Sequence, residues 1–224
     1  MTSMKAPISG LFLIAANVVP LIGVLFFEWD TLLVLALFWI ENLIIGLFNL
    51  LRMLVVLFVN KLPGDSFTLI FFIVHYGAFC AGHGAILTGL LPYPAVDYQA
   101  YFAFESPGVA RLFLDGAAVF LGFIEHFSPM ILIGLAGLVL SHSVSFVEHF
   151  VLRGEMYRLS VNKLMLRPYQ HIIVMHIGLI GGALLLELLA SPVWLLALIV
   201  VLKIAFDFRQ HRGRHKPPSE VTNF

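Results

Sequence analysis

The clearest pattern along the chain is a series of long apolar stretches, separated by short segments rich in charged residues, proline and glycine. An α-helix needs roughly 20 apolar residues to cross a bilayer, and most of these stretches have about that length. They cover residues 8–27, 31–52, 67–91, 128–152, 168–189 and 192–208. The second remains apolar as far as Val59, which is typical of a long, tilted helix. The pattern predicts an all-α protein, a polytopic transmembrane helical bundle with six spans.

Residues 108–124 are apolar but contain Arg111 and Asp115, so they form either a seventh span or a short re-entrant or interfacial helix. Positive charge favours the cytoplasmic side of a membrane protein. Basic residues gather at the N-terminus, in the turn near Lys61, in the connector 153–167 and in the tail. These groups share one side only if 108–124 does not cross. We therefore predict six spans, or seven if this segment crosses, and two cytoplasmic termini.

The composition supports a membrane location and narrows the function. Hydrophobic residues make up 60% of the chain and charged residues 12%, whereas soluble domains have about a quarter charged residues. We expect one transmembrane domain over residues 1–208, with the lipid bilayer as its partner, and a basic cytoplasmic tail over 209–224. The net charge of zero argues against a nucleic-acid partner. The single cysteine, Cys80, excludes a disulfide framework within the chain.

Ionisable side chains inside the predicted spans are costly to bury and therefore point to function. We take the cytoplasmic ends of predicted spans two to five to be Arg52, Phe67, Leu152 and Pro168. At 1.5 Å per residue, Glu41, His75, His142 and His176 then lie roughly 12–17 Å from that face. Four helices thus each place one possible metal ligand at a similar depth. We predict that these four residues form an intramembrane metal site.

Further polar residues surround this set in the predicted spans. A metal-bound imidazole needs a partner for its second nitrogen, and Asn42, Tyr76 and Ser145 are candidates. A second layer nearer the cytoplasm contains His149 and His171, at the ends of their helices. His83 lies nearer the outside and belongs to neither layer by this measure. These residues are the predicted supporting shell, and no catalytic residue is assigned.

Three imidazoles and a carboxylate suit zinc or iron. The first hypothesis is a metal-dependent enzyme of hydrolase type that acts on a lipid or another membrane-soluble substrate, with metal-bound water as nucleophile. The second is a haem- or quinone-linked electron carrier with two axial histidines. The third is an ion- or proton-coupled transporter or an assembly factor that uses Glu41 and histidines as a relay. The motifs G-x-S-x-G and H-E-x-x-H are absent from the sequence.

Three segments carry a resemblance to a known group of proteins. They are Phe38-Trp39-Ile40-Glu41-Asn42, Gly46-Leu47-Phe48-Asn49, and the run from Phe71 to Phe79 with His83-Gly84. Together they resemble an uncharacterised family of bacterial membrane proteins, a domain of unknown function. The resemblance implies an inner-membrane location and covers most of the chain. It implies no activity and assigns no functional residue.

Overall fold

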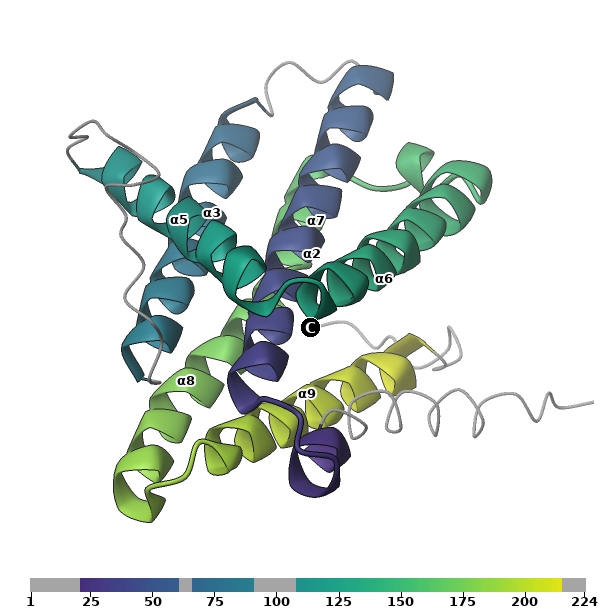
Figure 1. Ribbon diagram of the computed structural model, residues 1–224. Helices are drawn as coiled ribbons and strands as arrows, with labels where there is room; N and C mark the ends of the chain where they lie inside the picture. The colour runs from purple at the N-terminus through teal and green to yellow at the C-terminus, as the bar shows by residue number, and fades with distance from the viewer. Residues whose placement is uncertain (1–20, 61–65, 91–107, 215–224) are drawn as a thin grey trace, which may run out of the picture.

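The computed structural model describes residues 21–60, 66–90 and 108–214 of the protein (Figure 1). All regular secondary structure in these residues is helical, which confirms the predicted all-α class. The main helices are α2 (Thr31–Val59), α3 (Ser66–Leu90), α5 (Val109–Phe127), α6 (Met130–Ser145), α7 (Val161–Leu166), α8 (Tyr169–Leu189) and α9 (Val193–Arg214). A π-helical turn, Phe146–Leu152, continues α6, and a short 3-10 helix, Glu155–Tyr157, follows it.

Among the described residues, four helical segments are long and apolar enough to cross a membrane. They are Thr31–Val59, Ser66–Leu90, Met130–Leu152 and Val161–Leu189. The predicted number of six spans is not confirmed. The first predicted span, 8–27, lies mostly outside the described residues, and the apolar part of α9, Val193–Phe206, is shorter than a span.

The segment predicted as a re-entrant or interfacial helix is helix α5, which runs obliquely across α3 (Figure 1). Phe113 of α5 lies against Gly77 of α3, and its Phe123 ring meets Trp39 of α2 edge to face at 5.8 Å. Arg111 forms an ion pair with Asp115 one turn later, at 2.9 Å. The predicted helix is therefore present, and its position relative to the bilayer stays a prediction.

Helix α2 lies at the centre of the bundle and contacts α3, α5, α6, α7, α8 and α9. It begins at Thr31 because the Asp30 carboxylate accepts hydrogen bonds from the backbone N–H groups of the first turn, at 2.7 and 3.2 Å. Its buried face includes Trp39, whose indole N–H donates to the carbonyl of Cys80 at 2.8 Å. The Tyr76 hydroxyl donates to the carbonyl of Asn42 at 2.9 Å. These contacts align α2 and α3 in opposite directions.

Helix α3 runs parallel to α7 and α8 with an almost constant register. Thr68 contacts Asn162 at 3.2 Å, and His75 contacts Tyr169 at 2.8 Å. His83 contacts His176 at 2.7 Å, so the three pairs are separated by 94, 94 and 93 residues. A constant offset means that α7 and α8 together act as one span beside α3. The fifth predicted span, 168–189, therefore starts too late, because the helical path begins at Val161.

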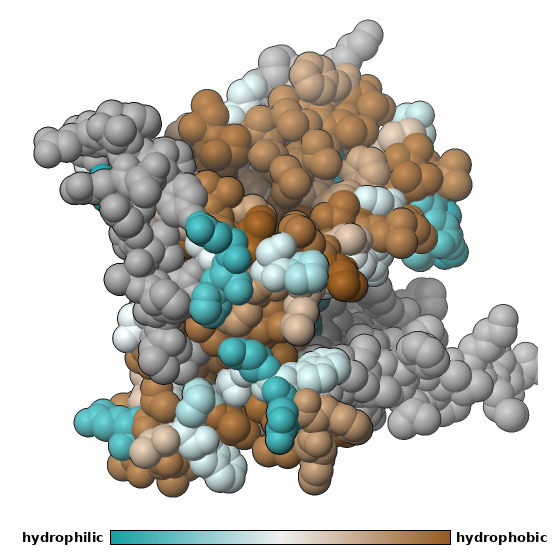
Figure 2. Space-filling view, viewed as in Figure 1, coloured by the Kyte–Doolittle hydropathy of each residue, from teal (hydrophilic) through white to brown (hydrophobic). Residues whose placement is uncertain are grey.

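The antiparallel pair α8 and α9 is held at close range by glycines. A side chain at Gly178 would approach Ile199 to 2.5 Å, and one at Gly182 would collide with Leu195. Small residues let two membrane helices approach closely. This contact sets the position of α9, and with it the position of Lys203, against α2. The surface in Figure 2 is largely hydrophobic, as expected where lipid replaces water.

Candidate functional site

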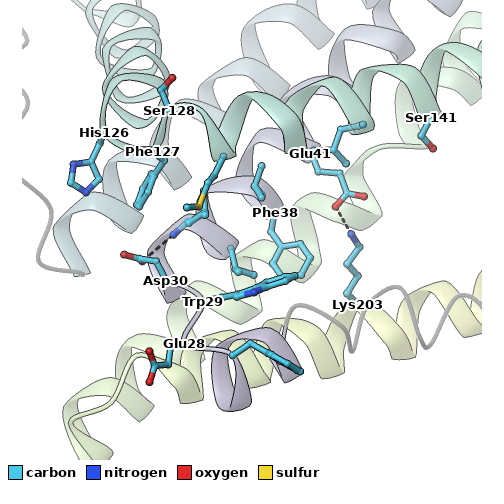
Figure 3. Close-up of a pocket in the computed structure, with 18 residues that line it drawn as sticks. Glu28, Trp29, Asp30, Phe38, Glu41, His126, Phe127, Ser128, Ser141 and Lys203 are labelled. Carbon is cyan, nitrogen blue, oxygen red and sulfur yellow. Dashed lines mark hydrogen bonds and ion pairs between the residues drawn. The ribbon is translucent and has the colours of Figure 1, made fainter.

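The central polar contact of the bundle is an ion pair between Glu41 of α2 and Lys203 of α9. The Lys203 ammonium donates to a Glu41 carboxylate oxygen, and the two side chains are only 15% and 20% exposed, lysine first. Figure 3 shows the two side chains pointing toward each other from their helices. Opposite charges attract strongly where water is scarce, and an unpaired charge there is costly. The pair therefore balances each charge with the other.

Two histidines complete the surroundings of this ion pair. His142 of α6 and His171 of α8 are both half-buried, and both interact electrostatically with Glu41. The imidazole of His142 also stacks on Phe48, with ring centroids 5.8 Å apart. His171 also lines a small space together with Glu41 and Lys203, so α2, α8 and α9 each contribute one ionisable side chain there.

A large cavity borders the ion pair between α2, α6 and α9 (Figure 3). Its volume is about 1310 Å³. Apolar side chains at helical spacing form two of its walls: Leu33, Val34, Leu37 and Phe38 from α2, and Met130 and Leu138 from α6. Glu41, Ser141 and Lys203 lie at one end, and Glu28 and Asp30 line it where α2 begins. Because Asp30 precedes Glu41 by eleven residues, the cavity follows α2 for about 16 Å.

The four predicted metal ligands do not gather at one point. Glu41 pairs with Lys203 and His142 stacks on Phe48, whereas the other two lie at the contact between α3 and α8. His75 Nδ1 lies 2.8 Å from the Tyr169 hydroxyl, and His176 Nδ1 lies 2.7 Å from Nε2 of His83. Within the described residues, no group of three or more His, Cys, Asp or Glu side chains is placed to hold a metal ion.

The predicted depths of the α8 histidines explain this outcome. The predicted cytoplasmic end of the fifth span is Pro168, but α7 extends that span back to Val161. The seven added residues move the α8 side chains about 10 Å deeper. His171, predicted for the second layer, therefore lies beside Glu41, and His176 lies at the depth of His83.

The predicted supporting residues have other partners. The Asn42 amide donates to the carbonyl of Phe38 at 2.9 Å, and the Tyr76 hydroxyl donates to a backbone carbonyl rather than to an imidazole. Ser145 is half-buried at the end of α6, and His149 is exposed. His83 is 3% exposed and pairs with His176, although its predicted depth separated it from the site.

Lys203 is the site residue that the sequence reasoning missed. It lies in the apolar run Leu202-Lys203-Ile204-Ala205-Phe206 of the last predicted span. Its neighbours are apolar, whereas those of the lysine and arginines in the tail are mostly polar or charged. Charged residues inside spans usually pair with one another. A lone lysine in one span and a lone glutamate in another are the signal that predicts such a pair.

The apolar helices and the enclosed charge cluster define a helical protein of the kind that resides in a lipid bilayer. The model of a family of unknown function (DUF6498) matches residues 1–223, so the chain belongs to that family, as the sequence resemblance predicted. No curated protein and no solved structure matches the chain.

Proposed function

We propose that this protein binds an amphipathic, membrane-soluble molecule, a lipid or a quinone, in the cavity beside Glu41 and Lys203. The observation that carries the proposal is the combination of a cavity of about 1310 Å³ with apolar walls and a charged pair at one end. Sites for small molecules are commonly 300–1,000 Å³, mostly apolar, with few polar groups that orient the ligand. A cavity of this size accommodates a long apolar tail as well as a head group.

The charged pair supplies both kinds of hydrogen-bonding group to such a head group. The Lys203 ammonium has three N–H donors, and Glu41 offers two acceptor oxygens, of which the pair uses one donor and one acceptor. A carbonyl or hydroxyl of a head group therefore finds a partner without breaking the ion pair. The apolar walls from α2 and α6 match the tail.

The other end of the cavity is suited to the membrane surface. Glu28 and Asp30 line it, next to Trp29, which is 48% exposed. Tryptophan is enriched where apolar and aqueous regions of a membrane meet. We propose that the ligand enters there.

Extraction of the purified protein with organic solvent, followed by mass spectrometry, tests the proposal. We expect one class of lipid or quinone at near-stoichiometric amount, retained after detergent exchange. In Glu41→Gln and Lys203→Met variants, the amount should fall several-fold. Random annular lipids, present in equal amounts in wild type and in both variants, would contradict the proposal.

We propose metal-dependent hydrolysis as a second candidate because Glu41 and His171 line one small space and His142 interacts electrostatically with the same carboxylate. A metal ion would have to draw these three side chains together, since they do not form a metal-binding group in the described residues. Residues from facing helices are a known source of intramembrane metal ligands. Elemental analysis of the protein purified without chelators tests this candidate. One zinc or iron per chain, lost in His142→Ala, would support it, whereas a metal content unchanged by that substitution would count against it.

The paired histidines His83 and His176 give no support to haem ligation between them. Their nitrogens are 2.7 Å apart, a hydrogen-bond distance. Axial ligation of one iron needs two metal–nitrogen bonds of about 2 Å each on opposite sides, and so a wider gap. A quinone-linked protein fits the apolar cavity, and a visible absorption spectrum of the purified protein tests the haem alternative with other histidine pairs.

The proposed orientation rests on charge. The connector between the π-helical turn Phe146–Leu152 and α8 contains Arg153, Arg158, Lys163 and Arg167. It lies at the end of the bundle where α2 finishes, because Asn60 contacts Met156 there. Basic loops favour the cytoplasm. We propose a bacterial inner-membrane location with this end, the tail and the N-terminus cytoplasmic, and labelling of engineered cysteines from either side of intact cells tests it.

A further inference from the structure

A second, much smaller space also borders the Glu41–Lys203 pair. Its volume is about 20 Å³, and its polar lining consists of Glu41, Asn42, His171 and Lys203. Glu41 and Lys203 line both spaces, so the ion pair forms part of the wall between them. Ile45 is one of the apolar residues that close the small space.

Asn42 lines this space, and one of its side-chain atoms lacks a hydrogen-bond partner among the described residues. The residue is 6% exposed, and its amide nitrogen donates to the carbonyl of Phe38 at 2.9 Å. Its side-chain oxygen, Oδ1, has no hydrogen-bond partner among the residues that the structure describes. A buried amide oxygen without a donor is costly, and native proteins usually satisfy such atoms, often with internal water.

We infer that this space is a binding site for one ordered water molecule, which links the Glu41–Lys203 pair to His171. A space of about 10–15 Å³ suffices for one water, and such a water needs two to four polar partners. The water donates one hydrogen to Asn42 Oδ1 and accepts from the Lys203 ammonium, which has donors to spare. Its second hydrogen is directed to a ring nitrogen of His171, which lines the same space.

Water fits this site better than a metal cation. The positive charge of Lys203 repels a cation at this range, and Glu41 is already neutralised by its partner. Water provides the hydrogen-bond donor that Asn42 Oδ1 lacks without adding a further positive charge beside Lys203. Because of the bridge, the contribution of Asn42 to stability depends on His171, although the two side chains come from different helices. The site does not depend on the proposed ligand in the large cavity.

A double-mutant cycle measured by thermal unfolding in detergent tests the bridge. Asn42→Leu should lower Tm by about 2–4 °C, and by clearly less when His171 is already leucine, because the bridge is then lost in both backgrounds. The control Ile45→Val changes the wall without removing a polar partner, and its effect should be equal in both backgrounds. A Tm raised by Asn42→Leu, or the same loss in both backgrounds, would overturn the inference.

Crystals grown from a lipid phase give an independent readout that does not need a variant. We expect density for one water within hydrogen-bonding distance of Asn42 Oδ1. Ordered side chains with no such density, at a resolution where other internal waters are visible, would reject the site. Density with short, multiple oxygen contacts typical of a cation would also reject it.

Discussion

Glu41 and Lys203 are 162 residues apart in the sequence, yet they form the ion pair at the centre of the bundle. Each lies within an apolar helical run, and each charge would be costly to bury alone. Their pairing joins α2, in the middle of the bundle, to α9, which otherwise packs mainly on α8. The same pair lines both the large cavity and the small polar space. A substitution in the pair should therefore change both the stability of the protein and ligand binding in the proposed site.

Removing one member of this pair should destabilise the protein more than removing both. Glu41→Gln or Lys203→Met leaves one buried charge without its partner, at a cost of about 3 kcal/mol. The double variant removes both charges and should recover most of that loss. Thermal unfolding in detergent measures the three effects, and strictly additive losses would show that the two side chains do not interact.

Gly182 should be intolerant of any side chain because α9 occupies the adjacent space. A Cβ there would lie 3.1 Å from the Cα atom of Leu195 and would collide with the side chain of that residue, so α8 and α9 must separate. We expect Gly182→Ala to lower Tm by several degrees. The control is Gly82→Ala in α3, where a Cβ meets nothing within 4 Å. The Tm of this control should be unchanged or slightly raised, because alanine favours a helix more than glycine does. Equal Tm values for the two variants would contradict the close contact.

Gly137 offers a way to fill the large cavity without disturbing the packing. It lines that cavity, and a Cβ at this position meets nothing within 4 Å. Gly137→Leu should therefore abolish retention of the co-purified lipid or quinone while Tm stays within about 2 °C of wild type. Gly82→Leu provides the matched control on α3. Undiminished ligand in Gly137→Leu would show that the ligand binds elsewhere.

The register between α3 and α7 predicts a specific cross-link. Thr68 Oγ1 and Asn162 Oδ1 are 3.2 Å apart, so cysteines at these positions should form a disulfide under mild oxidation. Thr68→Cys paired with Tyr169→Cys should not, because position 169 lies about 10 Å further along the helical path. Both pairs belong in a Cys80→Ala background. A bond in the second pair but not the first would mean that the fifth span starts near Pro168, as the sequence predicted.

Much of the helical architecture was predictable from the order of apolar and polar residues. A helix rises 1.5 Å per residue, so a run of about 20 apolar residues has the length of a span wherever it occurs. This rule located the cores of α2, α3, α6 and α8. It failed at the start of the fifth span because α7 is only six residues long and is followed by Arg167-Pro168, which has the composition of a loop. The packing of α7 on α2 and α3 makes it part of the span.

The sequence by itself also determined that Glu41 and several histidines lie within apolar helices, because their positions in the runs require it. Only the tertiary structure decided their partners. A side chain's direction depends on the rotation of its helix, and that rotation is set by contacts with other helices, such as Gly178 and Gly182 against α9. Depth alone therefore grouped His75 and His176 with Glu41. Packing instead turned them toward Tyr169 and His83 and brought Lys203 to the glutamate.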